Sequence, residues 1–138
     1  MRSVSLALTM LLSIVAFSAE AHVYSATQVA ALEQLVQTDS FEPTPFYTGV
    51  ADPVLRARLN SNIQSCVKAA VALAKAGAEP GQIISLIKDS IWHVPREDLD
   101  TEDAERYAGG YEAILDALEI ESSDGVLNDW MYGFDVEA

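Results

Sequence analysis

The sequence predicts an all-α protein, a compact bundle of four or five helices that follows a cleaved signal peptide. Apolar residues recur at three- and four-residue steps through most of the chain, which is the spacing of one face of an α-helix. No convincing alternating strand and no internal repeat interrupts this pattern. Half of the 138 residues are apolar, which supplies one hydrophobic core and excludes the composition of a disordered chain.

The first 21 residues have the features of a secretory signal peptide. Arg2 is followed by an apolar run that is shorter than the roughly 20 residues needed to cross a bilayer. Ala19 and Ala21 are small residues at the −3 and −1 positions of a cleavage site. We therefore expect residues 1–21 to be removed, and residues 22–138 to form a single helical domain that is periplasmic or secreted.

The first two helices are predicted from their start and stop signals. Thr27 is expected to cap a helix that ends near Gln37. Asp52 and Pro53 begin the longest helix, because a carboxylate can accept from free amides and proline fits the first turn. Gly77 ends this helix, which we expect to lie at the centre of the bundle.

Two more helices and a short last one complete the bundle. Pro80 opens a third helix, which ends ahead of Pro95 because the residue before a proline avoids helical geometry. A fourth is predicted over residues 101–118, with Gly109 and Gly110 inside it. Each interior glycine costs about 1 kcal/mol relative to alanine. The pair therefore indicates either tight packing against a neighbour or a break.

The loop between the first two helices, residues 38–51, contains two prolines and a glycine, which disfavour helix. It also carries three aromatic residues, Phe41, Phe46 and Tyr47. Because aromatic side chains contribute large apolar areas, we expect all three to fold back over the core.

Charge is sorted along the chain. Residues 22–96 carry six acidic and six basic residues, whereas residues 97–138 carry fourteen acidic residues and a single basic one. The net charge of −13 therefore belongs to the last part of the chain, and it argues against nucleic acid or a membrane surface as partner. This acidic part is either a solvated face or a surface for a basic protein. The candidate partner-binding residues are Glu97, Asp98, Glu102 and Asp103.

The inventory of reactive groups favours a non-enzymatic protein without a cofactor. No serine-hydrolase motif, zinc-binding helix or phosphate-binding glycine loop is present. The single cysteine, Cys66, excludes an internal disulfide and lies on an apolar stripe, which predicts an inert thiol; a dyad with His93 is the alternative. A new N-terminus at His22, together with His93, could hold copper. A small metal-binding protein or enzyme that uses these histidines is therefore the alternative function.

The acidic turn after the fourth helix fails as a calcium loop. Ile120 and Met131 would occupy the first and the bidentate ligand positions of such a loop, and neither supplies an oxygen from its side chain. Weak surface calcium binding by Glu119, Glu121 and Asp124 is the alternative to a simple capping turn.

Residues 121–134, which read ESSDGVLNDWMYGF, resemble the C-terminal signature of a bacterial family, domain of unknown function 4844. The resemblance implies a compact helical fold and no assigned activity. We expect its serines and aspartate to cap the last helix, its glycine to turn the chain, and its aromatic residues to pack as a lid, with an exposed docking patch as the alternative. These structural residues are Ser122, Ser123, Asp124, Gly125, Trp130, Tyr132 and Phe134.

Taken as a whole, the sequence favours an exported helical domain that binds another protein. A specific form of this hypothesis is an inhibitor- or immunity-like role. In that role the acidic C-terminal face would block a basic cleft on a toxin or an enzyme.

Overall fold

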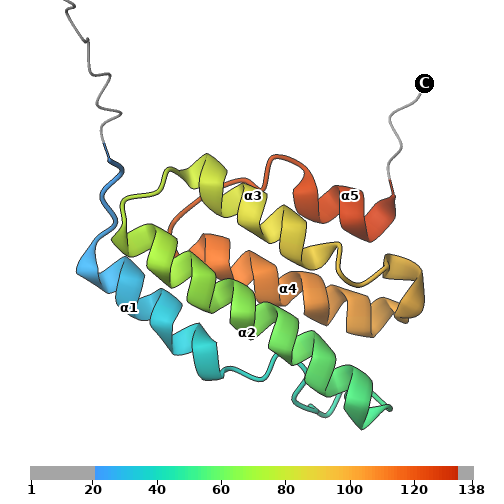
Figure 1. Cartoon of the computed structure of the whole chain (residues 1–138). Coiled ribbons are helices and arrows are strands. Elements are labelled where there is room, and N and C mark those ends of the chain that lie inside the picture. Colours follow the sequence, from blue (N-terminus) through green and yellow to red (C-terminus); the bar gives the residue numbers. More distant parts are fainter. Residues whose placement is uncertain (1–20, 134–138) are drawn as a thin grey trace, which may run out of the picture.

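The computed structural model describes residues 21–133, which form an all-α bundle (Figure 1). Its α-helices are α1 (Ala26–Gln34), α2 (Pro53–Lys75), α3 (Pro80–Ile91), α4 (Thr101–Ala117) and α5 (Val126–Tyr132). Two short 3-10 turns, η1 (Leu35–Gln37) and η2 (Arg96–Asp98), follow α1 and α3. Between residues 21 and 133 the chain has no strand, so the predicted fold class is confirmed. All of the expected signal peptide except Ala21 lies outside the described residues, as does Phe134.

The two longest helices, α2 and α4, form the centre of the bundle (Figure 1). α2 packs against α1, α3 and α4, while α4 also contacts α1, α3 and α5. α5 rests on α3 and α4. Over the described part of the chain, none of these helices has the length and apolar character needed to cross a membrane.

The helix starts follow local side-chain chemistry. At α2 the predicted cap is present: the Asp52 carboxylate accepts a hydrogen bond of 2.9 Å from the Val54 amide. At α1 the prediction was wrong by two residues, because Ser25 and not Thr27 is the cap. The Ser25 hydroxyl accepts from the Gln28 amide, and the Gln28 side chain accepts from the Ser25 amide, so each residue satisfies a free amide of the other.

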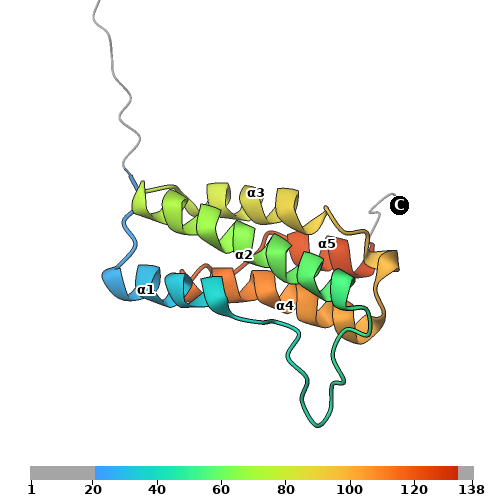
Figure 2. The same cartoon turned by 60° about the horizontal axis from the view of Figure 1, so that its bottom comes forward.

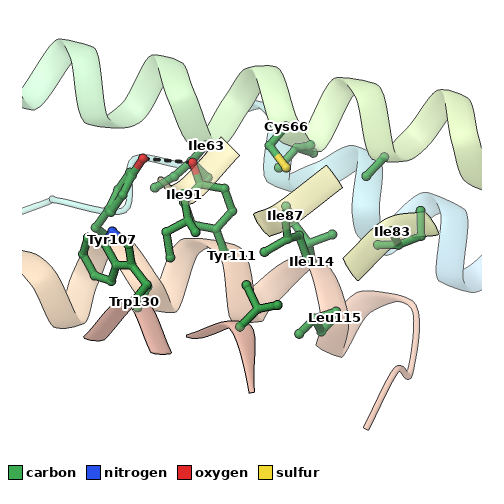
Figure 3. Packing of buried hydrophobic residues seen from close by; sticks show 14 of the residues in the cluster. Ile63, Cys66, Ile83, Ile87, Ile91, Tyr107, Tyr111, Ile114, Leu115 and Trp130 are labelled. Atoms are coloured by element: carbon green, nitrogen blue, oxygen red, sulfur yellow. Dashed lines mark hydrogen bonds between the residues drawn. The ribbon is translucent and has the colours of Figure 1, made fainter. Parts of the chain in front are cut away.

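A single hydrophobic cluster lies between the helices, and Figure 3 shows its central part. Its largest fully buried side chains come from every α-helix, from the loop before α2 and from the turn after α3: Leu32, Phe41, Leu59, Val67, Ile83, Ile87, Ile91, Val94, Tyr107, Tyr111, Ile114 and Trp130. The hydroxyl groups of Tyr107 and Tyr111 lie 3.0 Å apart, and the Tyr111 hydroxyl lies 2.8 Å from Ser90 Oγ. The buried phenols are therefore hydrogen-bonded to polar partners inside the core, as buried polar groups require.

α4 continues unbroken through Gly109 and Gly110, and the two glycines have different surroundings. A Cβ atom at Gly110 would lie 2.5 Å from Cδ1 of Ile63, so this glycine lets α4 pack closely on α2. A Cβ atom at Gly109 would have no neighbour within 4 Å. Tight packing therefore explains Gly110 and leaves Gly109 without a structural reason in the bundle.

The loop between η1 and α2 projects from the bundle (Figure 2). Phe41 and Tyr47 are buried, as predicted. Phe46 is 94% exposed, so the expectation that it covers the core was wrong. The reason is local: the backbones of Thr44 and Tyr47 pair with each other, and this turn places Phe46 at its tip.

Candidate functional site

A groove of about 490 Å³ runs between α4, the turn that follows it and α5. One wall is an exposed stripe of α4, formed by Glu105, Gly109, Glu112 and Asp116. These residues are spaced by three or four positions and therefore share one helix face. The turn and α5 form the other wall. The remaining lining residues are Ala108, Leu115, Ile120, Glu121, Ser122, Ser123, Gly125, Leu127, Asn128, Met131 and Tyr132.

The groove carries uncompensated negative charge. Every charged side chain that lines it is acidic: Glu105, Glu112, Asp116 and Glu121. Within residues 21–133, the ion pairs that the chain forms are Arg56 with Asp39 and Lys75 with Glu33, and both lie away from the groove. Arg106, which is adjacent in sequence to Glu105, does not line the groove. Its guanidinium carbon lies 4.6 Å from the centre of the Tyr47 ring. A cationic ligand would thus meet several carboxylates with no competing cation among the lining residues.

Apolar side chains also line the groove, among a larger polar and acidic lining. Leu115 is buried, and Ile120, Leu127 and Met131 are partly buried against the core. Carboxylates with apolar side chains among them match the chemistry of lysine and arginine side chains, which combine an aliphatic stem with a charged head.

Gly109 is the feature of the groove that the bundle itself does not require. It is exposed on the α4 wall, and a side chain there would meet nothing within 4 Å. An interior helix glycine costs about 1 kcal/mol relative to alanine. The absent side chain leaves the α4 backbone open to a ligand in the groove.

The turn before α5 is held by its own polar side chains. The Ser122 hydroxyl accepts from the Asp124 amide at 3.0 Å, and the Ser123 hydroxyl accepts from the Leu127 amide at 3.4 Å. Asp124 and Gly125 have positive φ angles of 52° and 85°, the left-handed region that favours glycine. The N-cap of α5 is Gly125, which turns the chain as predicted and has no capping side chain. Of the three residues predicted to cap, Ser123 accepts from an amide of the first turn of α5, whereas Ser122 and Asp124 only shape the turn before it.

The aromatic residues of α5 divide into two kinds. Trp130 is 1% exposed, and its indole nitrogen donates a hydrogen bond of 2.9 Å to the Val94 carbonyl. It therefore packs as the predicted lid. Tyr132 is 66% exposed at the edge of the groove, so the lid prediction was wrong for this residue.

The acidic residues singled out from the sequence do not form one surface. Glu97 and Asp98 lie in η2 and are exposed, as is Glu102 in the first turn of α4. Asp103 is only 7% exposed, so it cannot belong to an exposed acidic face. It is buried because the Tyr47 hydroxyl, from the loop before α2, donates to its carboxylate at 2.6 Å.

The contact between Tyr47 and Asp103 also perturbs the phenol. Burial raises the pKa of Tyr47, and the hydrogen bond to the Asp103 carboxylate raises it further. The phenol is therefore a persistent donor at neutral pH. The backbone of Asp103 has a separate role at the start of α4. Its amide donates a hydrogen bond of 2.8 Å to the carboxylate of Asp100, the residue that caps this helix.

Cys66 and His93 line the same shallow pocket of about 370 Å³, together with Asn62, Asp89 and Ser90. Cys66 is 3% exposed, and burial raises the pKa of its thiol to about 12. The thiol is therefore protonated near neutral pH, and a protonated thiol is a poor nucleophile. This geometry supports the inert cysteine and not the dyad with His93.

His22 and His93 lie at opposite ends of α3. The His22 amide donates to the Gly77 carbonyl at 3.0 Å, just ahead of α3, whereas His93 follows the end of that helix. A helix of 12 residues is roughly 18 Å long, so one copper ion cannot bind both side chains. Across the described residues, no three His, Cys, Asp or Glu side chains are grouped to hold a metal ion. This finding includes the acidic turn after α4.

The sequence analysis did not predict the groove, although the residue spacing that forms one of its two walls is present in the sequence. The spacing of the α4 carboxylates around Gly109 could have marked one wall. The second wall depends on where α5 folds back, which no local pattern encodes.

Comparisons with known proteins give a family and a similar fold. The family model described as "Domain of unknown function (DUF4844)" matches residues 23–135. A similar solved structure is the crystal structure of a DUF3571 family protein from Acinetobacter baumannii AYE. It is 34% identical, covers 77% of this chain and 89% of that chain, and superposes with a TM-score of 0.70. No curated protein matches the chain.

Proposed function

We propose that this chain, which belongs to the DUF4844 family, binds a basic segment of another protein in the groove between α4 and α5. The observation that carries the proposal is the composition of the groove: four carboxylates without a cation, several apolar side chains and an open backbone at Gly109. Long basic side chains fit such a surface, because they bury an aliphatic stem and place the charge among carboxylates.

The proposal includes export, for which the support is the amino-terminal sequence. An exported acidic domain would meet a secreted or periplasmic basic protein, and an inhibitor- or immunity-like role is the form of binding that we favour. Amino-terminal sequencing of the extracytoplasmic protein tests the export step, with His22 expected as the first residue. An intact Met1 would contradict export without affecting the groove.

The binding step is tested by a pull-down with two charge-matched variants. The groove variant carries Glu105→Gln, Glu112→Gln and Asp116→Asn. The control carries Glu97→Gln, Asp98→Asn and Glu102→Gln, which removes the same charge from the surface first proposed from the sequence. All six side chains are exposed, so both variants should keep the fold.

We expect the wild-type chain and the control to retain a basic protein at low salt and to release it at high salt. Exposed charges are screened beyond about 10 Å at 0.1 M salt, so the loss with salt should be steep. The groove variant should lose the same protein. Retention by the groove variant with loss in the control would instead assign binding to η2 and the start of α4. Equal retention by all three proteins would contradict the proposal.

A further inference from the structure

The loop between η1 and α2 projects from the bundle (Figure 2). Phe46 is an exposed large apolar side chain in this loop. At 94% exposure it is more exposed than any other large apolar residue among residues 21–133. Burying a phenylalanine side chain removes apolar surface from water and thereby stabilises a fold. The exposed Phe46 does not make this contribution to the free energy of folding. The loop is also separate from the groove, because none of its residues lines it.

The tip of the loop has a fixed conformation. The amide of Thr44 donates to the Tyr47 carbonyl at 2.8 Å, and the Tyr47 amide donates back at 3.2 Å. The Phe46 amide donates to the Thr44 hydroxyl at 3.3 Å. Pro43 and Pro45 further restrict the backbone, since each locks its own φ angle. The backbone at Phe46 is therefore fixed before a ligand buries the side chain.

Both sides of the loop are anchored in the bundle. On one side Phe41 is fully buried, and its amide donates to the Asp39 carboxylate at 2.9 Å. On the other side Tyr47 is buried and donates to Asp103 of α4. The anchors lie directly before and after the tip, so the loop presents Phe46 on a rigid base.

The charges around this loop restrict what could cover Phe46. Glu42 is exposed in the loop itself, and Asp100 acts electrostatically on the Tyr47 hydroxyl from the start of α4. The nearby cation, Arg106, is stacked on the Tyr47 ring. A second copy of the chain, with a net charge of −13, and an anionic lipid surface would both be repelled.

We propose that Phe46 is the anchor of a second protein-binding surface and inserts into an apolar pocket, rimmed by basic side chains, on a partner protein. Aromatic anchors that enter a pocket dominate the affinity of many interfaces. Because the backbone of the turn is already ordered, binding costs backbone entropy at few positions, which favours affinity further.

The first experiment places a photoreactive phenylalanine analogue at position 46 in cells that produce the protein. The matched control places it at position 54, because Val54 is 76% exposed on α2 and lies outside the loop. We expect a protein adduct from position 46 and none from position 54. The absence of a protein adduct, or an adduct of the chain with itself, would overturn the proposal.

The second experiment measures the affinity of the purified adduct partner for wild type, Phe46→Ala and Val54→Ala. We expect Phe46→Ala to bind at least about tenfold more weakly and Val54→Ala to bind like wild type. Equal affinity of wild type and Phe46→Ala would overturn the proposal, as would a lower thermal stability of Phe46→Ala, which would show that Phe46 supports the fold.

A third measurement addresses lipid as the occupant. Sedimentation with vesicles of phosphatidylethanolamine and phosphatidylglycerol should leave the protein in the supernatant. Vesicle binding that is lost in Phe46→Ala would assign the loop to a membrane and overturn the proposal. The groove variant described above should keep the Phe46-dependent affinity, so failure of one surface leaves the other testable.

Discussion

The two faces of α4 have opposite chemistry along the same stretch of helix. The buried face carries Tyr107, Tyr111 and Ile114, all fully buried in the core. The exposed face carries the groove carboxylates, which contact no basic residue in the described chain. Substitutions on the first face should therefore change stability, and substitutions on the second should change binding. Gly109 and Gly110, adjacent in sequence, belong to different faces.

The largest difference between the faces is expected from Ile114→Ala. Ile114 is fully buried at the centre of the core (Figure 3). Removing it should lower the free energy of unfolding by about 2–5 kcal/mol, through lost burial and the cavity that remains. Glu112→Ala, two residues away on the exposed face, should change it by less than about 0.5 kcal/mol. Denaturant unfolding of both variants checks the comparison, and equal effects would contradict it.

Alkaline pH should destabilise the protein through its buried groups. The Cys66 thiol has a pKa of about 12 in the fold against an ordinary 9.0, so the unfolded chain releases its proton first. The stability that the protonated Cys66 thiol contributes is fully present below pH 9 and is lost as pH rises toward 12. Between pH 9 and 11 the free energy of unfolding should fall by on the order of 2 kcal/mol from this group. Cys66→Ala should flatten the profile measured by urea unfolding, whereas an unchanged profile would contradict the buried, protonated thiol.

Gly110→Ala should destabilise the bundle by a smaller amount. Its new Cβ would lie 2.5 Å from Ile63 Cδ1, and overpacking of this kind costs about 1–3 kcal/mol. The better helix propensity of alanine offsets about 1 kcal/mol. The net loss should therefore be on the order of 1 kcal/mol in thermal or chemical unfolding. Adding Ile63→Val removes the colliding methyl group, so the double variant should recover part of the loss beyond the sum of the single changes.

Gly109→Ala should change the free energy of unfolding in the opposite direction, and by the smallest amount of these variants. Because its Cβ meets nothing, the gain in helix propensity should raise stability by up to about 1 kcal/mol. The same methyl group would stand in the groove, so binding of the basic partner should weaken. A variant that is more stable and binds equally well would separate Gly109 from the binding surface.

Local sequence signals explain the helix boundaries well. Asp52 with Pro53 marks the start of α2. The family suspected from the sequence is also confirmed, by a match over residues 23–135. Even the misplaced start of α1 had a local signal, because serine followed three residues later by glutamine is the pattern of Ser25 and Gln28.

Contacts between distant residues explain what the sequence could not predict. Asp103 belongs to an acidic run and yet is buried, because Tyr47 reaches it from 56 positions earlier. Gly109 and Gly110 are equivalent in a helical pattern, and the neighbours of Gly110 in the fold, Ile63 and Ser40, distinguish them. Phe46 is exposed although it was predicted to be buried. The prediction failed because composition cannot show which of three nearby aromatic residues a turn directs outward.

The hydrogen bond between Tyr47 and Asp103 has a consequence for how the family can vary over evolution. A carboxylate that is 7% exposed becomes costly if its phenol partner is replaced by phenylalanine, and the phenol loses its acceptor if the acid is replaced first. Neither single change is neutral, whereas the joint change to an apolar pair can be. Positions 47 and 103 should therefore covary among relatives, and an alignment in which they vary independently would show that the loop is held in another way.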